Sequence, residues 1–286
     1  MGYVQMKQII ATYEPDNSLK KGYLSIFGGI ASEVKSNGWL TFQLFKRDFF
    51  SMYKQSLIGL VWIVLLPLVN MATFLLLSRS GILNLGDIPV PYPIYALLGM
   101  TFWQIFATGI QSCGSALTNA GDMILRINFS KKSLVIAAMG KPIISCAIQF
   151  ILVGILFFIN GVAPQKTILL APIVILPVIV FTLGLGFIVA LLNTVIRDTG
   201  NVLSIGMTLF MYLTPVLYAR PQMGLLGQVT KYNPMYYFIT AGRDLALKGS
   251  LTEPNGFMVS SLASLLILIV AVMVFHLTET RIAERI

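Results

Sequence analysis

The chain has 286 residues, of which 56% are apolar and 11% are charged, and its 20 Lys and Arg against 11 Asp and Glu give a net charge of +9. Soluble domains carry about 25% charged residues, so the surface of this chain could not be hydrated on all sides. The composition therefore excludes a soluble enzyme, a disordered chain and a disulfide-based scaffold, and it indicates a membrane protein.

Six long windows of the sequence contain no charged residue. Each reaches the roughly 20 residues that a helix needs to cross a bilayer core. The apolar runs 143–159 and 168–192 do not alternate as barrel strands would. We therefore predict an all-α integral membrane protein whose transmembrane domain, residues 57–277, has six transmembrane helices. The predicted spans are 57–77, 92–113, 134–160, 167–192, 201–219 and 256–277.

A cytoplasmic tail is predicted over residues 1–30, followed by an amphipathic helix over residues 31–56. In this second segment aromatic side chains recur at roughly helical spacing beside basic ones. The pattern is typical of a helix that lies in the headgroup layer. We expect it to act mainly as an anchor, a role that leaves its basic residues able to meet a diphosphate headgroup. Those residues are Lys46, Arg47 and Lys54.

The segment 220–246, between the fifth and sixth predicted spans, is apolar but is interrupted by prolines, glycines and charged residues. Its charge-free pieces, 221–230 and 232–242, are too short to cross a membrane. We therefore predict re-entrant or interfacial helices on the outer side. Residues 278–286 are predicted to form a second cytoplasmic tail.

Lys and Arg are distributed unevenly between the two sides of the predicted bundle. If the amino terminus is cytoplasmic, the inner segments hold fourteen of the 20 basic residues and the outer segments hold six. Because positive charge collects on cytoplasmic loops, we expect a multi-pass protein of the cytoplasmic (inner) membrane with both termini inside. Anionic membrane lipid then accounts for the net charge, and no nucleic-acid partner is expected.

Residues that could hold a metal or catalyse a reaction are scarce. His276 is the single histidine, and Cys113 and Cys146 lie far apart in predicted spans, where we expect them to be small apolar fillers. We therefore expect no metal site, no catalytic residue and no cofactor bound by this chain. The sequence has no glycine-rich phosphate loop, so if ATP drives this protein, ATP and Mg bind to a separate chain.

Three motifs follow one another through this framework: LFKRDFFSMYKQSLIGLVWIVLLPL at 44–68, NTVIRDTGNV followed by LTPVLY, and YNPMYYFITAGRDL. Together they resemble the signatures of type-2 ABC exporter permeases, in particular the polysaccharide branch that exports O-antigen, capsule and teichoic-acid chains. The residues that carry the resemblance are Arg47, Asp48, Gly59, Trp62, Pro67, Arg197, Asp198, Thr214, Pro215, Val216, Tyr218, Asn233, Pro234 and Arg243.

The resemblance implies a permease subunit of an ATP-driven exporter that moves lipid-linked polysaccharide to the outer face of the membrane. It implies three further components: a second copy of this chain, two ABC ATPase subunits and a glycan substrate on a lipid carrier. A pore between two copies is also expected on physical grounds, because six spans leave little room for a wide conduit within one copy.

The loop 114–133 follows the second predicted span and combines charged with apolar residues. Given the resemblance, we expect a short cytoplasmic helix that presses apolar side chains into a groove on the ATPase. The alternative is an ordinary inner-surface loop, because short amphipathic helices are common. The residues expected at the ATPase contact are Asp122, Met123, Leu125, Arg126 and Phe129.

A polymer path needs groups that hold sugars weakly and repeatedly, and aromatic faces stack on sugar rings without requiring one hydroxyl pattern. Aromatic and polar residues at helical spacing in the first, second and fifth spans are the candidates. The alternative is that they form interface belts or pack between helices. The candidates are Trp62, Leu66, Asn70, Phe74, Tyr95, Phe102, Trp103, Phe106, Met207, Met211, Thr214 and Tyr218.

Two other functions stay open at this stage. Related permeases move drugs, small lipids or other solutes, so the cargo can differ within the same transporter class. The other alternative is a membrane glycan polymerase or ligase. Such an enzyme generally needs acid, base or arginine groups in a large outer loop, and the segment 220–255 offers charged residues but no histidine and no paired carboxylates.

Overall fold

The structure, a computed structural model, describes residues 32, 36–54, 61–81, 86, 88, 90–121, 130–196, 198–220 and 223–282. Within these ranges every regular element is a helix, which confirms the predicted all-α class. The helices are α2 (Gly38–Lys54), α3 (Val61–Arg79), α4 (Tyr92–Asn119), α6 (Lys131–Ala138), α7 (Gly140–Ile159), the 3-10 helix η2 (Lys166–Leu170), α8 (Ala171–Val195), α9 (Thr199–Leu213), α10 (Gly224–Lys231), α11 (Pro234–Leu247) and α12 (Pro254–Ile282).

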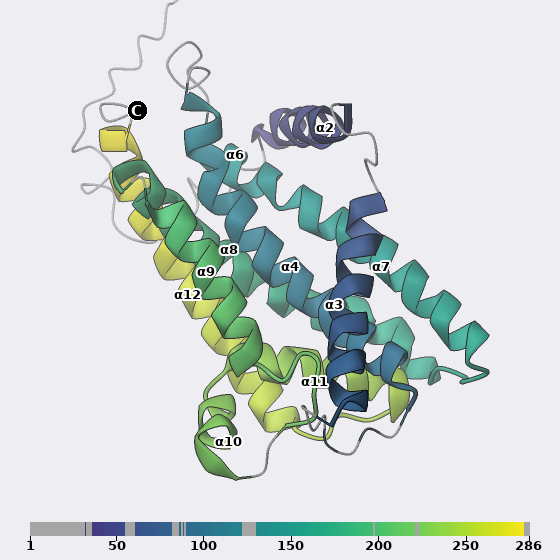
Figure 1. Ribbon diagram of the computed structural model, residues 1–286. Helices are drawn as coiled ribbons and strands as arrows, with labels where there is room; N and C mark the ends of the chain where they lie inside the picture. The colour runs from purple at the N-terminus through teal and green to yellow at the C-terminus, as the bar shows by residue number, and fades with distance from the viewer. Residues whose placement is uncertain are drawn as a thin grey trace, which may run out of the picture.

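The long helices form a tilted bundle whose two ends differ (Figure 1). Helix α2 lies across one end, next to α6, whereas α10 and α11 lie at the other end. We call these the α2 end and the α11 end. Helix α4 is central, because it packs against α3, α6, α7, α8, α9 and α11. Helix α12 packs on α8 and α11 and finishes at the α2 end.

Four described stretches are long and apolar enough to cross a membrane: Tyr92–Asn119, Lys131–Ile159, Lys166–Val195 and Pro254–Thr278. The chain is thus a multi-pass membrane protein. The apolar stretches of the helices α3 and α9, Val64–Leu77 and Thr199–Leu213, are shorter. The count of six spans therefore stays a prediction for these two helices.

The fifth predicted span ends earlier than expected. We predicted a helix as far as residue 219, but α9 ends at Leu213, and Thr214 is extended with a ψ of 130°. Pro215 explains this end, because the residue before a proline is disfavoured in the α conformation. Residues 214–218 therefore leave the helix as an irregular segment.

The third predicted span is divided, whereas we expected a continuous helix over residues 134–160. Met139 separates α6 from α7. Pro142 lacks the backbone N–H that would continue the hydrogen-bond ladder across this point. The break lies beside α2, because a Cβ atom on Gly140 would overlap the ring of Phe45.

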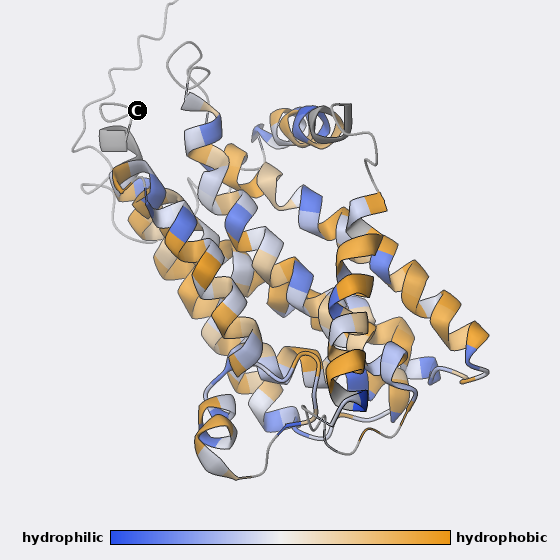
Figure 2. Ribbon diagram, in the orientation of Figure 1, coloured by the Kyte–Doolittle hydropathy of each residue, from blue (hydrophilic) through white to orange (hydrophobic). Residues whose placement is uncertain are grey.

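Aromatic rings fill the core along α4. Phe106 stacks on Phe181 of α8 with the ring centroids 5.5 Å apart, and Phe102 meets the edge of Phe150 of α7 at 5.9 Å. Such pairs add about 0.5–1.5 kcal/mol beyond the burial of their area. The outward surfaces of α7 and α12 are also hydrophobic (Figure 2), as contact with lipid requires.

Candidate functional site

Most of the exposed surface of the bundle suits contact with lipid. On α12 every exposed position between Met258 and Leu277 carries an apolar side chain. On α7 the exposed positions between Ile143 and Ile159 carry apolar side chains or glycine. The exposed surface of α9 departs from this pattern, because it mixes polar with apolar residues.

Exposed polar side chains form a row along α9. Asn201, Ser204, Thr208 and Tyr212 are separated by three or four residues, a spacing that places them on one face of the helix. We call this row the polar stripe. Polar side chains within a membrane almost always face protein or a water-filled cavity. The polar stripe is therefore the candidate site for a polar ligand. The exposed row beside it is apolar and consists of Val202, Ile205 and Leu209.

The face of α3 that we predicted to line a path is only partly exposed. Trp62 and Leu66 are 45% and 52% exposed, whereas Asn70 is half-buried and Phe74 is buried. Phe74 stacks on Tyr212 of α9 with the ring centroids 6.2 Å apart. Helix α3 thus lies beside the polar stripe at the α11 end, with Trp62 and Leu66 on the surface.

Other residues predicted to line a path are enclosed by the chain itself. Phe102, Trp103, Phe106 and Thr214 each expose 3% or less of their surface. They are covered because α8 and α11 pack closely on α4. Within one copy these four side chains are therefore not exposed to a path, and their role in one stays a prediction. Four more candidates are half-buried rather than exposed, namely Tyr95, Met207, Met211 and Tyr218.

A buried arginine joins three segments at the α11 end. Arg243 of α11 is 6% exposed, and its Nε donates to the carbonyl oxygen of Tyr95 at 3.2 Å. Its Nη1 donates to the carbonyl oxygen of Pro215 at 3.0 Å, and its Nη2 donates to that of Val216. The guanidinium carbon also lies 3.6 Å from the centroid of the Tyr95 ring, in a cation–π contact. Arg243 thus ties α11 to the first turn of α4 and to the segment after α9.

Two further contacts hold the segment that follows α9. Asn233 caps α11 by accepting a hydrogen bond from the backbone N–H of Met235 at 3.0 Å, and its amide donates to the hydroxyl of Thr214 at 2.8 Å. The hydroxyl of Tyr95 donates to the carbonyl oxygen of Tyr218 at 3.3 Å. Helices α4 and α11 therefore fix this segment at several points along its length.

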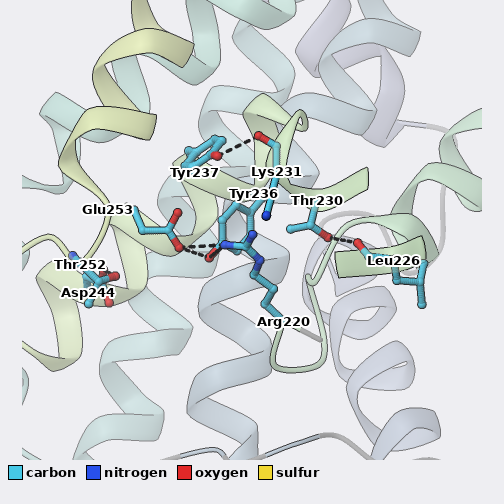
Figure 3. Close-up of polar contacts among 9 residues, drawn as sticks. All are labelled: Arg220, Leu226, Thr230, Lys231, Tyr236, Tyr237, Asp244, Thr252 and Glu253. Atoms are coloured by element: carbon cyan, nitrogen blue, oxygen red, sulfur yellow. Dashed lines mark hydrogen bonds and ion pairs between the residues drawn. The ribbon is translucent and has the colours of Figure 1, made fainter. Parts of the chain in front are cut away.

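A second polar cluster at the α11 end joins Arg220, Tyr236 and Glu253 (Figure 3). Arg220 Nη1 lies 3.1 Å from Glu253 Oε1 and 3.2 Å from the hydroxyl of Tyr236, which itself donates to Glu253. Burial raises the pKa of Tyr236 to about 12, and the hydrogen bond to Glu253 acts in the same direction. Partial burial alone would lower the pKa of Arg220, but the hydrogen bond to Tyr236 and the charge of Glu253 raise it overall.

The other carboxylate at this end is also engaged. Asp244 Oδ2 accepts from the backbone N–H of Thr252 at 2.8 Å and from its hydroxyl, and Asp244 Oδ1 pairs with Lys248 Nζ at 3.0 Å. Asp244 and Glu253 thus join α11 to the start of α12. A glycan polymerase or ligase needs an acid and a base that face substrate. Because both carboxylates are occupied by contacts within the chain, this arrangement does not favour such an enzyme.

The basic residues predicted to meet a headgroup lie on α2. Lys46 and Arg47 are exposed, and Arg47 Nη2 lies 2.7 Å from Asp48 Oδ1. Trp39 and Phe42 are 75% and 58% exposed on the same helix. Exposed aromatic rings beside exposed basic groups are typical of a helix in the headgroup layer.

Residues 40–247 match the family of ABC-2 type transporters. The chain belongs to this family. It is 25% identical over 254 residues to the O-antigen export system permease protein RfbA of Myxococcus xanthus, covering 86% of this chain and 95% of the relative. Two proteins of that name from Klebsiella pneumoniae are 26% and 27% identical over 245 and 247 residues, each covering 83% of this chain and 91% of the relative.

The matched region of this ABC-2 family protein runs from α2 to the end of α11. It therefore includes the polar stripe and the contacts of Arg243. The predicted resemblance to type-2 ABC permeases is confirmed.

Some predicted residues of the permease lie outside the part that the structure describes. They are Gly59, Asp122, Met123, Leu125, Arg126, Phe129 and Arg197, together with the side chain of Lys54. The remaining motif residues are placed. Asp198 is exposed just before α9, Pro67 is buried inside α3, and Pro234 is the first residue of α11.

The predicted path residues of α9 differ from those of the polar stripe. The prediction was based on Met207 and Met211, which pack against the core, and it did not include the smaller polar residues. The signal for the polar stripe is present in the sequence as polar residues at i, i+3, i+7 and i+11 of a charge-free window. Among the residues that the structure describes, no group of three or more His, Cys, Asp or Glu could hold a metal ion.

Proposed function

We propose that the chain is the permease subunit of an ATP-driven exporter that moves lipid-linked polysaccharide across the inner membrane. The cargo is O-antigen-like, capsule-like or teichoic-acid-like. The observation that carries the proposal is the polar stripe, a row of amide and hydroxyl groups on a helix between apolar surfaces. Such groups hydrogen-bond to sugars, and the exposed rings of Tyr212 and Trp62 offer stacking faces. The names of the three relatives support a polysaccharide cargo.

The polar stripe also supports an assembly of two copies. No residue of α9 is buried within this chain, so one copy does not shield the stripe. Thr208 Oγ1 donates to the carbonyl oxygen of Ser204 at 3.1 Å, yet hydroxyl and amide groups that face lipid leave part of their hydrogen-bonding capacity unused, which is costly. A second copy related by a two-fold axis places the two stripes opposite each other and closes a path between them. Trp62 and Leu66 of α3 then flank this path.

We place the α2 end at the cytoplasmic face, with both chain termini on that side. Lys46 and Arg47 on α2 then attract the diphosphate headgroup of the lipid-linked glycan as it approaches in the inner leaflet. The loop 114–133 contacts one of two partner ATPase subunits, which bind ATP and Mg. Closure of these subunits drives the permease, which has no catalytic role of its own.

A deletion strain tests the polysaccharide assignment. We expect lipid-linked glycan to accumulate on the cytoplasmic side and surface glycan to fall, as measured by lipid extraction and by surface blotting. The wild-type gene should restore export. The double variant Ser204→Leu and Thr208→Leu should not restore it, because it makes the centre of the polar stripe apolar.

The matched control is the double variant Ile205→Leu and Leu209→Ile, which changes the neighbouring apolar row without changing its polarity. It should restore export in full. Normal surface glycan in the deletion strain would contradict the polysaccharide assignment and would favour another solute as cargo.

Purification tests the partner assignment. The tagged permease should bring down an untagged ATPase, and lipid-linked glycan should stimulate ATP hydrolysis by this complex. Glycan export by the purified chain in vesicles without an ATPase would contradict the proposal.

A further inference from the structure

Helix α9 is held very differently at its two ends. No residue between Thr199 and Leu213 is buried, whereas Thr214, Val216 and Leu217 are almost fully enclosed. Helix α9 therefore runs over the surface of the bundle, and the chain enters the core directly after the last turn of this helix.

Ring contacts strengthen this difference along the helix. Phe210 lies 5.8 Å from Trp103 and 5.9 Å from Phe106, between ring centroids, and all of these contacts belong to the second half of α9. The first half contains Gly200 and Gly206, and a Cβ atom on Gly206 would meet no atom within 4 Å. In that half Leu203 packs partly against the core beside Gly114 of α4, so the first half is held less than the second and moves at lower cost in free energy.

Arg243 holds the enclosed segment through hydrogen bonds to backbone carbonyl oxygens. Arg243 donates to Tyr95, Pro215 and Val216. These last two carbonyls follow the C-terminus of α9, where the helix itself supplies no donor. A planar guanidinium can reach several acceptors in fixed directions, which an ammonium cannot do. Burying its charge is costly, so the position of this residue calls for a reason beyond filling space.

The surrounding backbone is shaped to admit this side chain. A Cβ atom on Gly99 of α4 would overlap the guanidinium of Arg243 and the carbonyl oxygen of Val216. A glycine at this position therefore allows α4, α11 and the segment after α9 to meet at one point. Asn233 adds a second link from α11 to Thr214.

We propose that Arg243 is a positioning residue that makes the α11 end of α9 a fixed pivot. Helix α9 then moves as a lever: residues 214–216 stay in place on α4 and α11, and the α2 end of the helix swings. This role rests on the proposed function in so far as α9 lines the path. It assigns the motion of the permease to one end of that helix.

Spin-label distances test the pivot in the complex of the permease with its ATPase, reconstituted in nanodiscs. One label pair, Val202→Cys with Val274→Cys, reports the α2 end of α9 against α12. The other pair, Leu209→Cys with Met258→Cys, reports the α11 end. All four positions are exposed and apolar. The native Cys113 and Cys146 are buried. Dilution with unlabelled chains isolates distances within one copy.

In the wild type we expect ATP to shift the distance of the Val202 pair and to leave that of the Leu209 pair unchanged and narrow. Arg243→Gln should widen the Leu209 distribution, and Arg243→Lys should widen it less. ATP hydrolysis should continue in both variants while export falls, a loss of coupling that a general loss of folding would not produce.

Lys248→Gln is the matched control, because it removes a cation and its 3.0 Å ion pair on α11 without contacting α9. It should leave both distances as in the wild type. If Arg243→Gln does not fold, Asn233→Ser serves in its place: serine keeps the helix cap but is too short to reach Thr214, and it should widen the Leu209 distribution.

Equal shifts of both pairs on ATP addition would overturn the pivot. So would an unchanged, narrow Leu209 distribution in folded Arg243→Gln. The effect of Arg243→Gln is also measured in the permease without ATPase or glycan, so failure of the pivot is distinguishable from failure of the polysaccharide assignment, which the deletion strain tests separately.

Discussion

Glycines decide how closely α4 and α11 approach each other. A Cβ atom on Gly242 of α11 would overlap the ring of Phe102, just as one on Gly99 would overlap Arg243. Both glycines lie inside helices, where glycine is a poor choice unless a close approach requires it. The close packing of α4 against α11 therefore requires glycine at both positions, in addition to the aromatic rings around them.

Gly242→Ala should destabilise the permease by about 1–3 kcal/mol, because overpacking a dense core forces rings and backbone to shift. The measurement is the thermal unfolding midpoint in detergent. Gly154→Ala on α7 is the control, since a Cβ atom there would meet nothing within 4 Å. Equal midpoints for Gly242→Ala and the wild type would show that this contact is looser than the structure indicates.

Tyr236→Phe should also destabilise the permease, by about 1–2 kcal/mol, because Arg220 and Glu253 lose a shared hydroxyl in a partly buried site. The folded-state pKa of about 12 is raised from the ordinary 10. The stabilisation of the folded state by the neutral Tyr236 hydroxyl is therefore complete below pH 10 and is lost as the pH rises toward 12. Unfolding midpoints at pH 8 and pH 11 should show a difference from wild type that shrinks with pH. Tyr232→Phe, at an 88% exposed position, should show none.

At the scale of one element, α9 offers two exposed rows of opposite character. Single cysteines at Ser204 and Thr208 should react with a membrane-impermeant thiol reagent, because in the proposed exporter the polar stripe faces a hydrated path. Cysteines at Ile205 and Leu209 should react far more slowly, because that row faces lipid. Labelling rates in intact membranes measure the difference, and equal rates for the two rows would remove the argument for a path along this helix.

Most of the long helices could be predicted from the sequence, because the greater part of each lies in a charge-free window bounded by charged residues. The breaks inside those windows were harder to predict. Pro215 is visible in the sequence, and it ends α9 before residue 214, although we predicted a span to residue 219. Pro142 gave the same kind of signal for the third span, but the apolar runs 134–139 and 143–148 led us to predict one continuous helix.

The candidate site could be predicted only in part, because helical spacing shows which residues share a face but not which face the neighbouring helices cover. Of the residues predicted to line a path, Trp62 and Leu66 are exposed, whereas Phe102 and Phe106 are buried beneath other helices. Arg243 was recognisable as a motif residue. The partners of Arg243 could not be predicted, because they are backbone carbonyl oxygens of residues distant in sequence. Every residue has such a carbonyl, so the sequence does not show which ones are used.

In the assembled exporter, the exposed face of α3 and the polar stripe of α9 are the surfaces that we expect to face the second copy. A cysteine at Leu66, which is 52% exposed, should be captured as a dimer by a short bifunctional thiol reagent in membranes. Leu266 on α12 is the matched control, because it is 63% exposed and α12 packs on α8 and α11, not on α3. Dimer capture through Leu266 and not through Leu66 would place the interface on the other side of the bundle.

A helix that is fixed at one end cannot widen a path evenly along its length. The 15 residues of α9 span about 22 Å, so under the proposed pivot a tilt displaces the end next to α8 most and the end held by Arg243 hardly at all. Two such helices facing each other in the proposed dimer would enclose a wedge-shaped opening that is widest at the α2 end, where the lipid-linked head group is proposed to enter.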